Sequence, residues 1–204
     1  MNGTIPILAD IAGTISNIPG AYDVLSTTAR LLSDGKPLAI AHLTDELGWS
    51  LERVDTILAC FPDVERDEAG NLVGFGLTLH ETPHSYQVDG KRLFTWCALD
   101  ALFFPVILGQ SACVTSRCRA TGVPIRMAVS PTGVADIEPS STVVSLVTAC
   151  EANELRGAFC NAVNFFASAE DARTWLSEQC SGQVLSVERA FILAKDCAAA
   201  MRAA

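Results

Sequence analysis

The sequence predicts an α+β fold, in which an N-terminal winged-helix-like helical module precedes a mixed or antiparallel β-sheet domain with flanking helices. Two observations carry this prediction. Apolar residues recur with helical spacing through residues 22–61, and later segments alternate strand-like stretches with turn dipeptides and further helical patterns. The 204 residues are enough for one domain with an appendage or for two small domains that share a core. We place the module at residues 1–80 and the second domain at residues 81–204.

The helical pattern begins at Tyr22–Ser33 and stops at Asp34-Gly35. Residues 38–47 then form a second predicted helix, and Gly48-Trp49 forms a turn. Ser50 is the expected N-cap of a third helix, because a hydroxyl oxygen at that position can accept a hydrogen bond from a free backbone N–H. These segments form a compact helix-turn-helix unit.

A predicted β-hairpin follows the third helix. Its turn is centred on Glu68–Asn71, and its second strand covers Leu72–Leu79. A helix-turn-helix with such a wing is typical of DNA-binding modules, but residues 36–92 hold five basic and ten acidic side chains. A helix that reads DNA is normally basic. We therefore expect a structural module with no nucleic-acid partner.

The second half opens with another predicted hairpin. Tyr86–Val88 and Arg92–Phe94 flank Asp89-Gly90, a dipeptide that tolerates the positive φ angles of a tight turn. Thr95 is the expected N-cap of a helix that runs to about Phe104. The remaining elements read as strands at Ala112–Arg117, Ile125–Ser130 (after a Thr121-Gly122 turn), Thr142–Val147 and Cys160–Phe166, and as helices at Glu151–Ala158, Ala169–Ser177 and Val187–Met201.

Composition narrows the setting in which the protein works. Half of the residues are hydrophobic, but the richest run, Ala98–Gly109, is broken by Asp100 and Pro105 and is shorter than the roughly 20 apolar residues that span a bilayer. The first twenty residues contain Asp10 and no Lys or Arg, unlike a secretory signal. The eight cysteines are scattered along the chain without the dense spacing of a disulfide-bonded scaffold, so we expect reduced thiols. We expect a cytoplasmic protein with no membrane partner.

A thiol and a carboxyl group are predicted to lie side by side. Cys97 and Asp100 are three positions apart, so both project from one face of a helix. If Thr95 caps this helix, Cys97 lies in its first turn, where the helix dipole favours a thiolate. Apolar neighbours would bury Asp100 and raise its pKa, which suits a proton donor. Taken alone, however, Cys97 could be inert core and Asp100 a surface residue or a structural hydrogen-bond acceptor.

The other candidate ligands are weaker. Cys113 and Cys118 are separated by four residues, unlike the two-residue gap of common zinc knuckles, and no histidine lies near them. Gly74-Phe75-Gly76 lacks the third glycine of a nucleotide-binding loop, so a nucleotide cofactor is not indicated. Cys160 alone says little. Core packing accounts for the remaining cysteines, Cys60, Cys150, Cys180 and Cys197.

Several segments together resemble the alkylmercury (organomercurial) lyase family. The most specific is the run Leu-Phe-Thr-Trp-Cys-Ala-Leu-Asp, combined with a second cysteine some sixty residues later. The resemblance covers most of the chain. The matching segments are Asp67–Leu79, Leu93–Asp100 with Phe104-Pro105, Ser116–Gly122, Val129–Pro131, Phe159-Cys160 and Phe165–Ser168.

This resemblance implies an activity and a site. Cys97 and Cys160 would be the thiolate ligands of mercury, and Asp100 would be the proton shuttle and a further oxygen ligand. The products would be a hydrocarbon and bound Hg(II), with no cofactor, in organomercurial detoxification. Cellular thiols would be co-substrates that carry the metal away, and a mercuric reductase is the expected acceptor. Cys118 matches a structural cysteine of the family, and Asn161 stands where some members have a further cysteine.

Two alternatives use the same cysteines without bond cleavage. A metal-sensing regulator would bind DNA through the winged helix and detect mercury or another soft metal. A carrier would hold mercury or copper between Cys97 and Cys160. The acidic N-terminal half argues against the regulator, and Asp100 argues against the carrier, which needs no proton donor.

Overall fold

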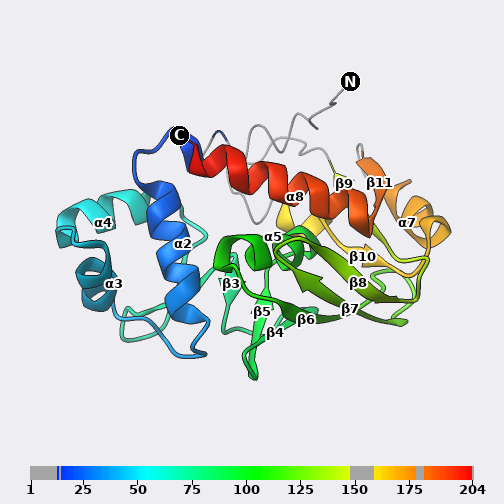
Figure 1. Cartoon of the computed structure of the whole chain (residues 1–204), viewed down its shortest axis with the longest axis horizontal. Helices are drawn as coiled ribbons and strands as arrows, with labels where there is room; N and C mark the ends of the chain where they lie inside the picture. Colours follow the sequence, from blue (N-terminus) through cyan, green and yellow to red (C-terminus); the bar gives the residue numbers. More distant parts are fainter. Residues whose placement is uncertain (1–12, 14, 148–158, 178–181, 204) are drawn as a thin grey trace.

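The computed structural model describes residues 13, 15–147, 159–177 and 182–203, and it confirms the α+β fold. Helices α2, α3 and α4 gather at one end of the molecule, β3 to β6 occupy the middle, and β9, β11 and α7 lie at the other end (Figure 1). The long helix α8 (Val187–Arg202) spans much of the distance between these ends and packs against helix α5 (Ala98–Leu108). In the described ranges, no helix is both long and apolar enough to cross a membrane.

The N-terminal helices form as the sequence predicts. Helix α2 covers Ala21–Leu32, α3 covers Ile40–Leu47 and α4 covers Leu51–Ala59. The Ser50 side chain accepts a hydrogen bond from the Arg53 backbone N–H at 3.3 Å, so Ser50 is the N-cap of α4. Each helix turns its apolar face inward, and together these faces make the core of this end of the molecule.

Eight antiparallel strands form one sheet, in the order β1-β2-β3-β5-β4-β6-β7-β8. A second sheet has the order β10-β9-β11. The strands are β1 Glu65–Arg66, β2 Leu72–Phe75, β3 Leu77–Thr78, β4 His84–Val88, β5 Lys91–Thr95, β6 Ala112–Arg117, β7 Pro124–Ser130, β8 Gly133–Glu138, β9 Val143–Val147, β10 Phe165–Phe166 and β11 Gly182–Ser186. Helix α7 covers Ala169–Leu176.

The wing differs from its prediction. The single strand expected at Leu72–Leu79 is broken at Gly76, whose φ of 78° turns the chain so that β2 pairs with β3. Strand β3 then pairs with β5, with Leu77 opposite Thr95. The wing is therefore part of the same sheet as the second half of the chain. The sheet therefore runs across the boundary that we place between residues 80 and 81. The division of the chain into two domains at this boundary stays a prediction.

The start of α5 also corrects the sequence reading. Thr95 is the last residue of β5 and not the helix cap, because its hydroxyl donates a hydrogen bond to the Cys97 carbonyl at 3.0 Å. Cys97 is the N-cap, and the helix runs through Pro105 to Leu108 instead of ending near Phe104. The hairpin before it is confirmed, with positive φ at both turn residues, Asp89 and Gly90.

The strand predicted at Cys160–Phe166 is wrong. Cys160–Ala162 is a turn of 3₁₀ helix, and only Phe165–Phe166 is a strand. Polar contacts bend the segment: the Asn164 N–H donates to the Ser145 hydroxyl oxygen at 3.0 Å, and that hydroxyl donates to the Ala162 carbonyl at 2.9 Å. Strands β8 and β11 were not predicted, and the helix expected at Glu151–Ala158 lies outside the described residues.

A buried histidine connects the two sheets. His84 on β4 is 3% exposed, and its Nδ1 lies 3.0 Å from the Ser116 hydroxyl on β6. The edge of its ring meets Phe165 on β10, with 5.7 Å between the ring centroids. Burial lowers the pKa of His84 to about 4, so the imidazole is neutral at physiological pH.

His84 should make the protein acid-labile. Between pH 6.5 and about 4, the unfolded chain binds a proton at His84 that the folded protein does not bind. The free energy of unfolding should therefore fall by roughly 3 kcal/mol as the pH falls through this window. Urea unfolding at a series of pH values measures this slope. His84→Gln should lose this part of it, and an unchanged slope in the variant would contradict the assignment.

Candidate active site

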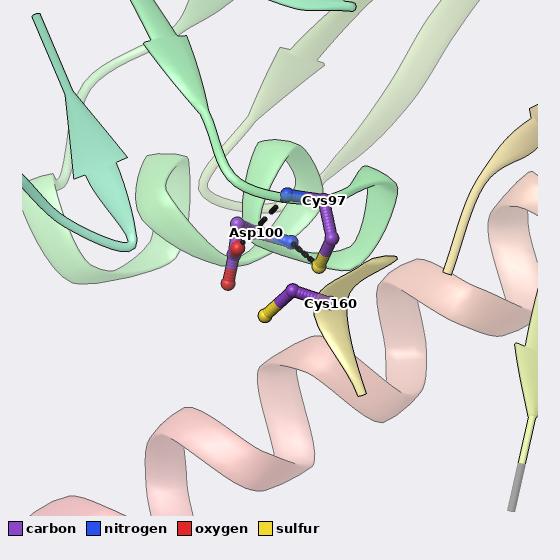
Figure 2. Close-up of side chains that lie close together, drawn as sticks. All are labelled: Cys97, Asp100 and Cys160. Carbon is purple, nitrogen blue, oxygen red and sulfur yellow. Dashed lines mark hydrogen bonds between the residues drawn. The ribbon is translucent and has the colours of Figure 1, made fainter. Parts of the chain in front are cut away.

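Two reciprocal hydrogen bonds join Cys97 and Asp100 at the start of α5. The Asp100 backbone N–H donates to the Cys97 Sγ at 3.4 Å, and the Cys97 N–H donates to the Asp100 Oδ2 at 3.1 Å (Figure 2). This arrangement is a capping box, in which the thiol takes the place of the usual hydroxyl. The helix cap thus holds the thiol beside the carboxyl group, as the spacing of the two residues predicts.

Cys160 completes the group from a distant segment of the chain. Its 3₁₀ turn is tied to α5 by the Ala98 N–H, which donates to the Val163 carbonyl at 3.1 Å. The two sulfurs and a carboxylate oxygen of Asp100 lie within 4.8 Å of one another, and in Figure 2 all three side chains approach the same space. The structure therefore brings all three predicted site residues together.

Burial sets the protonation state of the first thiol. The Cys97 side chain is fully buried, Cys160 is 3% exposed and Asp100 is partly buried. Desolvation raises the pKa of Cys97 well above its usual value, and the hydrogen bond with Cys160 and the Asp100 charge raise it further. A thiolate at Cys97 was expected to be favoured if Thr95 capped the helix. That condition is not met, because Cys97 is itself the cap, and the Asp100 N–H lowers the pKa of Cys97 less than these effects raise it.

Helix α8 brings a third thiol close to this group. Cys197 is 8% exposed and lies on the face of α8 that packs into the core. Burial, followed by the negative charge of Asp100, raises its pKa to about 12. Core packing, the role expected from the sequence, is confirmed by its burial. Its nearness to Asp100 was missed, because no local pattern relates α8 to α5.

The other described cysteines lie apart from this group. Cys118, which directly follows β6, is buried, and its Sγ donates a hydrogen bond to the Asp171 Oδ2 on α7 at 3.8 Å. Cys60 and Cys113 are exposed, so the core packing expected for Cys60 is wrong: its side chain lies at the end of α4 on the solvent side. Cys150 and Cys180 lie outside the described residues. Within the described part of the chain, Cys97, Asp100 and Cys160 form the one group of three or more potential metal ligands.

Paired buried thiols beside a carboxyl group define a class of protein that handles a soft metal ion and can also move a proton. Comparison with known proteins makes the class specific. Residues 77–199 match the family model for alkylmercury lyase, and residues 7–76 match the model for the helix-turn-helix domain of alkylmercury lyase. The chain belongs to the alkylmercury lyase family.

Individual relatives agree with the family models. The chain is 48% identical to the alkylmercury lyase of Pseudomonas putida over 86% of its own length and 83% of that protein. It is 44% identical to the alkylmercury lyase of Staphylococcus epidermidis, over 81% and 77%. The crystal structure of the mercury-bound form of MerB2 superposes with a TM-score of 0.80 and covers 97% of this chain and 98% of that one, at 22% identity.

These comparisons confirm the family, the fold and the enzyme class expected from the sequence. They also explain the winged-helix pattern, because the helix-turn-helix unit matches a domain of the lyase family itself. The DNA-binding regulator is therefore not favoured. The individual roles of Cys97, Cys160 and Asp100 are proposals.

Thiol burial predicts a strong contrast in alkylation rates. At pH 7.5, among the cysteines that the structure describes, iodoacetamide should modify Cys60 and Cys113 first and Cys97 on the order of a hundredfold more slowly, because a buried protonated thiol is a poor nucleophile. Peptide mass spectrometry at timed intervals measures the order of modification. The denatured chain, in which all thiols are accessible, is the control. Equal rates at Cys97 and Cys113 in the folded protein would contradict the prediction.

Proposed function

We propose that this enzyme cleaves the carbon–mercury bond of organomercurials by protonolysis, with Cys97 and Cys160 as mercury ligands and Asp100 as the proton carrier. The observation that supports this proposal most is the approach of two sulfurs and a carboxylate oxygen to within 4.8 Å of one another. Mercury is a soft ion that thiolates bind in preference to oxygen or imidazole ligands. A site for metal storage alone would not need the carboxyl group.

The first step is capture of the organomercury cation by a thiol. As the sulfur–mercury bond forms at Cys97, the thiol proton moves to the Asp100 carboxylate, which is already joined to Cys97 through the capping box. The metal supplies the driving force, because a thiol must lose its proton to become a metal ligand. The Asp100 N–H continues to donate to the sulfur and stabilises the negative charge that develops there.

The second step breaks the carbon–mercury bond. Cys160 becomes the second sulfur ligand and releases its own proton to solvent. Two thiolates push electron density onto mercury, so the carbon becomes more basic and accepts the proton held by Asp100. The electron pair of the carbon–mercury bond becomes the new carbon–hydrogen bond. Nothing is oxidised or reduced, so the reaction requires no redox cofactor, and Hg(II) stays bound to the two sulfurs.

Release of Hg(II) requires exchange with other thiols. Small cellular thiols can replace Cys97 and Cys160 one at a time, since thiolate ligands exchange by attack of a free thiol. The reducing cytoplasm would supply these thiols and keep both cysteines reduced. A mercuric reductase is the expected acceptor of the ion, in a pathway of organomercurial detoxification.

Substitutions should separate bond cleavage from metal binding. Asp100→Asn should lower the rate of benzene release from phenylmercury by about a hundredfold or more, because it removes the proton carrier. The same variant should still bind Hg(II), because both thiols remain. Gas chromatography of the product and a thiol-competition assay for Hg(II) measure the two properties. Unchanged benzene release by Asp100→Asn would remove Asp100 from the mechanism.

Cys97→Ala and Cys160→Ala should each lose nearly all benzene release, because a single thiolate activates the carbon less and holds the metal less tightly. Cys60→Ala is the matched control, since Cys60 is exposed on the N-terminal helices and lies outside the candidate site. It should retain wild-type turnover. Substantial activity in Cys160→Ala would contradict the two-thiolate scheme.

A further inference from the structure

We infer that Gly76, at the turn between β2 and β3, is a positioning residue for Asp100 and Cys97, and that the wing of the helix-turn-helix module thereby forms part of the active site. The inference rests on the proposed role of Asp100 as proton carrier. It gives the module a function inside the enzyme. Three contacts of the wing support it.

The first contact holds the backbone where the chain enters the site. The Gly76 carbonyl accepts a hydrogen bond from the Trp96 N–H at 2.9 Å, and Trp96 directly precedes Cys97. The pairing of Leu77 with Thr95 continues this contact along β3 and β5. The turn at Gly76 therefore fixes the position from which the chain passes into the capping box.

The second contact is a close approach to the helix face that carries Asp100. A Cβ atom placed on Gly76 would lie 2.9 Å from Cζ and 3.1 Å from Cε2 of Phe104. Phe104 follows Asp100 by one helical turn, so the two side chains share a face of α5. Its ring is 1% exposed and packs edge-on against Phe103, with 5.5 Å between centroids. The ring has little room to retreat from a larger residue at position 76.

The third contact reaches the carboxyl group itself. The same Cβ position is 3.8 Å from the Asp100 Oδ1, while Oδ2 accepts the Cys97 N–H. The wing backbone thus borders one oxygen of the carboxyl group, and the helix cap holds the other. A methyl group on Gly76 would press on Phe104 and so shift the helix face that also carries Asp100, while its distance to the Asp100 Oδ1 is that of an ordinary contact. Proton transfer depends on placement to a fraction of an ångström, so such a shift should affect catalysis more than folding.

The wing is also tied firmly at its base. The Thr78 hydroxyl, fully buried, donates a hydrogen bond to the Glu65 carboxylate, which joins β3 to β1. Gly74 leaves room for that contact, because a Cβ there would lie only 2.7 Å from the Thr78 hydroxyl oxygen. A wing held in this way keeps Gly76 in a fixed position beside Phe104 and Asp100.

Two glycines of the same wing permit a matched test. Gly76 and Gly70 have φ angles of 78° and 83°, so an alanine at either position carries similar backbone strain. A Cβ on Gly70 would meet nothing within 4 Å. Gly76→Ala should therefore reduce kcat for benzene release from phenylmercury by at least about tenfold, and Gly70→Ala should stay within about twofold of wild type. The rate is expressed per Hg(II)-binding site, so that partial unfolding does not lower it.

A double variant tests the physical cause. Phe104→Leu removes the ring that Gly76→Ala would strike, so the alanine should cost kcat much less in the Phe104→Leu background than in the wild type. Hg(II) affinity should stay within about twofold in the single variants, because the two thiols are untouched. If the Gly76→Ala variant does not fold, the kcat of the double variant is compared with that of Phe104→Leu alone. This comparison measures the effect of the alanine at position 76 in a protein that folds.

The outcomes separate this inference from the proposed function. Equal kcat values for Gly76→Ala and Gly70→Ala would overturn the positioning role of Gly76, and so would a tenfold loss that persists unchanged in the Phe104→Leu background. Either result leaves the proposed function intact as long as Asp100→Asn is inactive. An active Asp100→Asn enzyme would instead overturn the proposed function.

Discussion

The pair of hydrogen bonds between Cys97 and Asp100 serves both the fold and the proposed chemistry. The first N–H groups of α5 have no partners within the helix, and the cap satisfies the Asp100 N–H with a sulfur atom instead of a hydroxyl oxygen. The carboxylate in turn accepts the N–H of the cap residue. The same two bonds that start the helix therefore hold a thiol and a carboxyl group side by side. Strand β5, the wing and the turn that bears Cys160 are all arranged around this helix end.

Burial of this helix end opposes ionisation of the Cys97 thiol, a cost that mercury would have to overcome in the proposed mechanism. Helix α5 is apolar on nearly every side and lies between the large sheet and α8. Its surroundings keep Cys97 protonated, and Cys197 on α8 is kept protonated in the same way. A buried thiol resists alkylation and oxidation because burial disfavours the charged thiolate. It can still lose its proton to a soft metal, because the sulfur–mercury bond neutralises the negative charge on the sulfur. In the proposed mechanism, the partly buried Asp100 is the carboxyl group next to Cys97 that would accept this proton.

Local patterns predicted much of the fold and two of the three residues of the candidate site. Helical spacing located α2 and α4, and the spacing of three placed Asp100 beside Cys97. The cap was misassigned to Thr95 because a threonine is a common N-cap and a cysteine is not. Cys160 was beyond local reasoning, because side-chain hydrogen bonds from Ser145, on another strand, shape the turn that holds it. Only the family resemblance connected it with Cys97.

The hydrogen bonding of the wing bears on why a lyase carries a helix-turn-helix. A wing that binds DNA needs exposed strands and positive charge. Here β1 pairs with β2, β2 with β3 and β3 with β5, so the wing is part of the eight-stranded sheet. Acidic side chains also outnumber basic ones in residues 36–92. What the wing does contact is the backbone before Cys97 and the helix face of Asp100. The position of the wing is therefore constrained by the same residues that form the candidate site, and the wing shares one sheet with the second half of the chain.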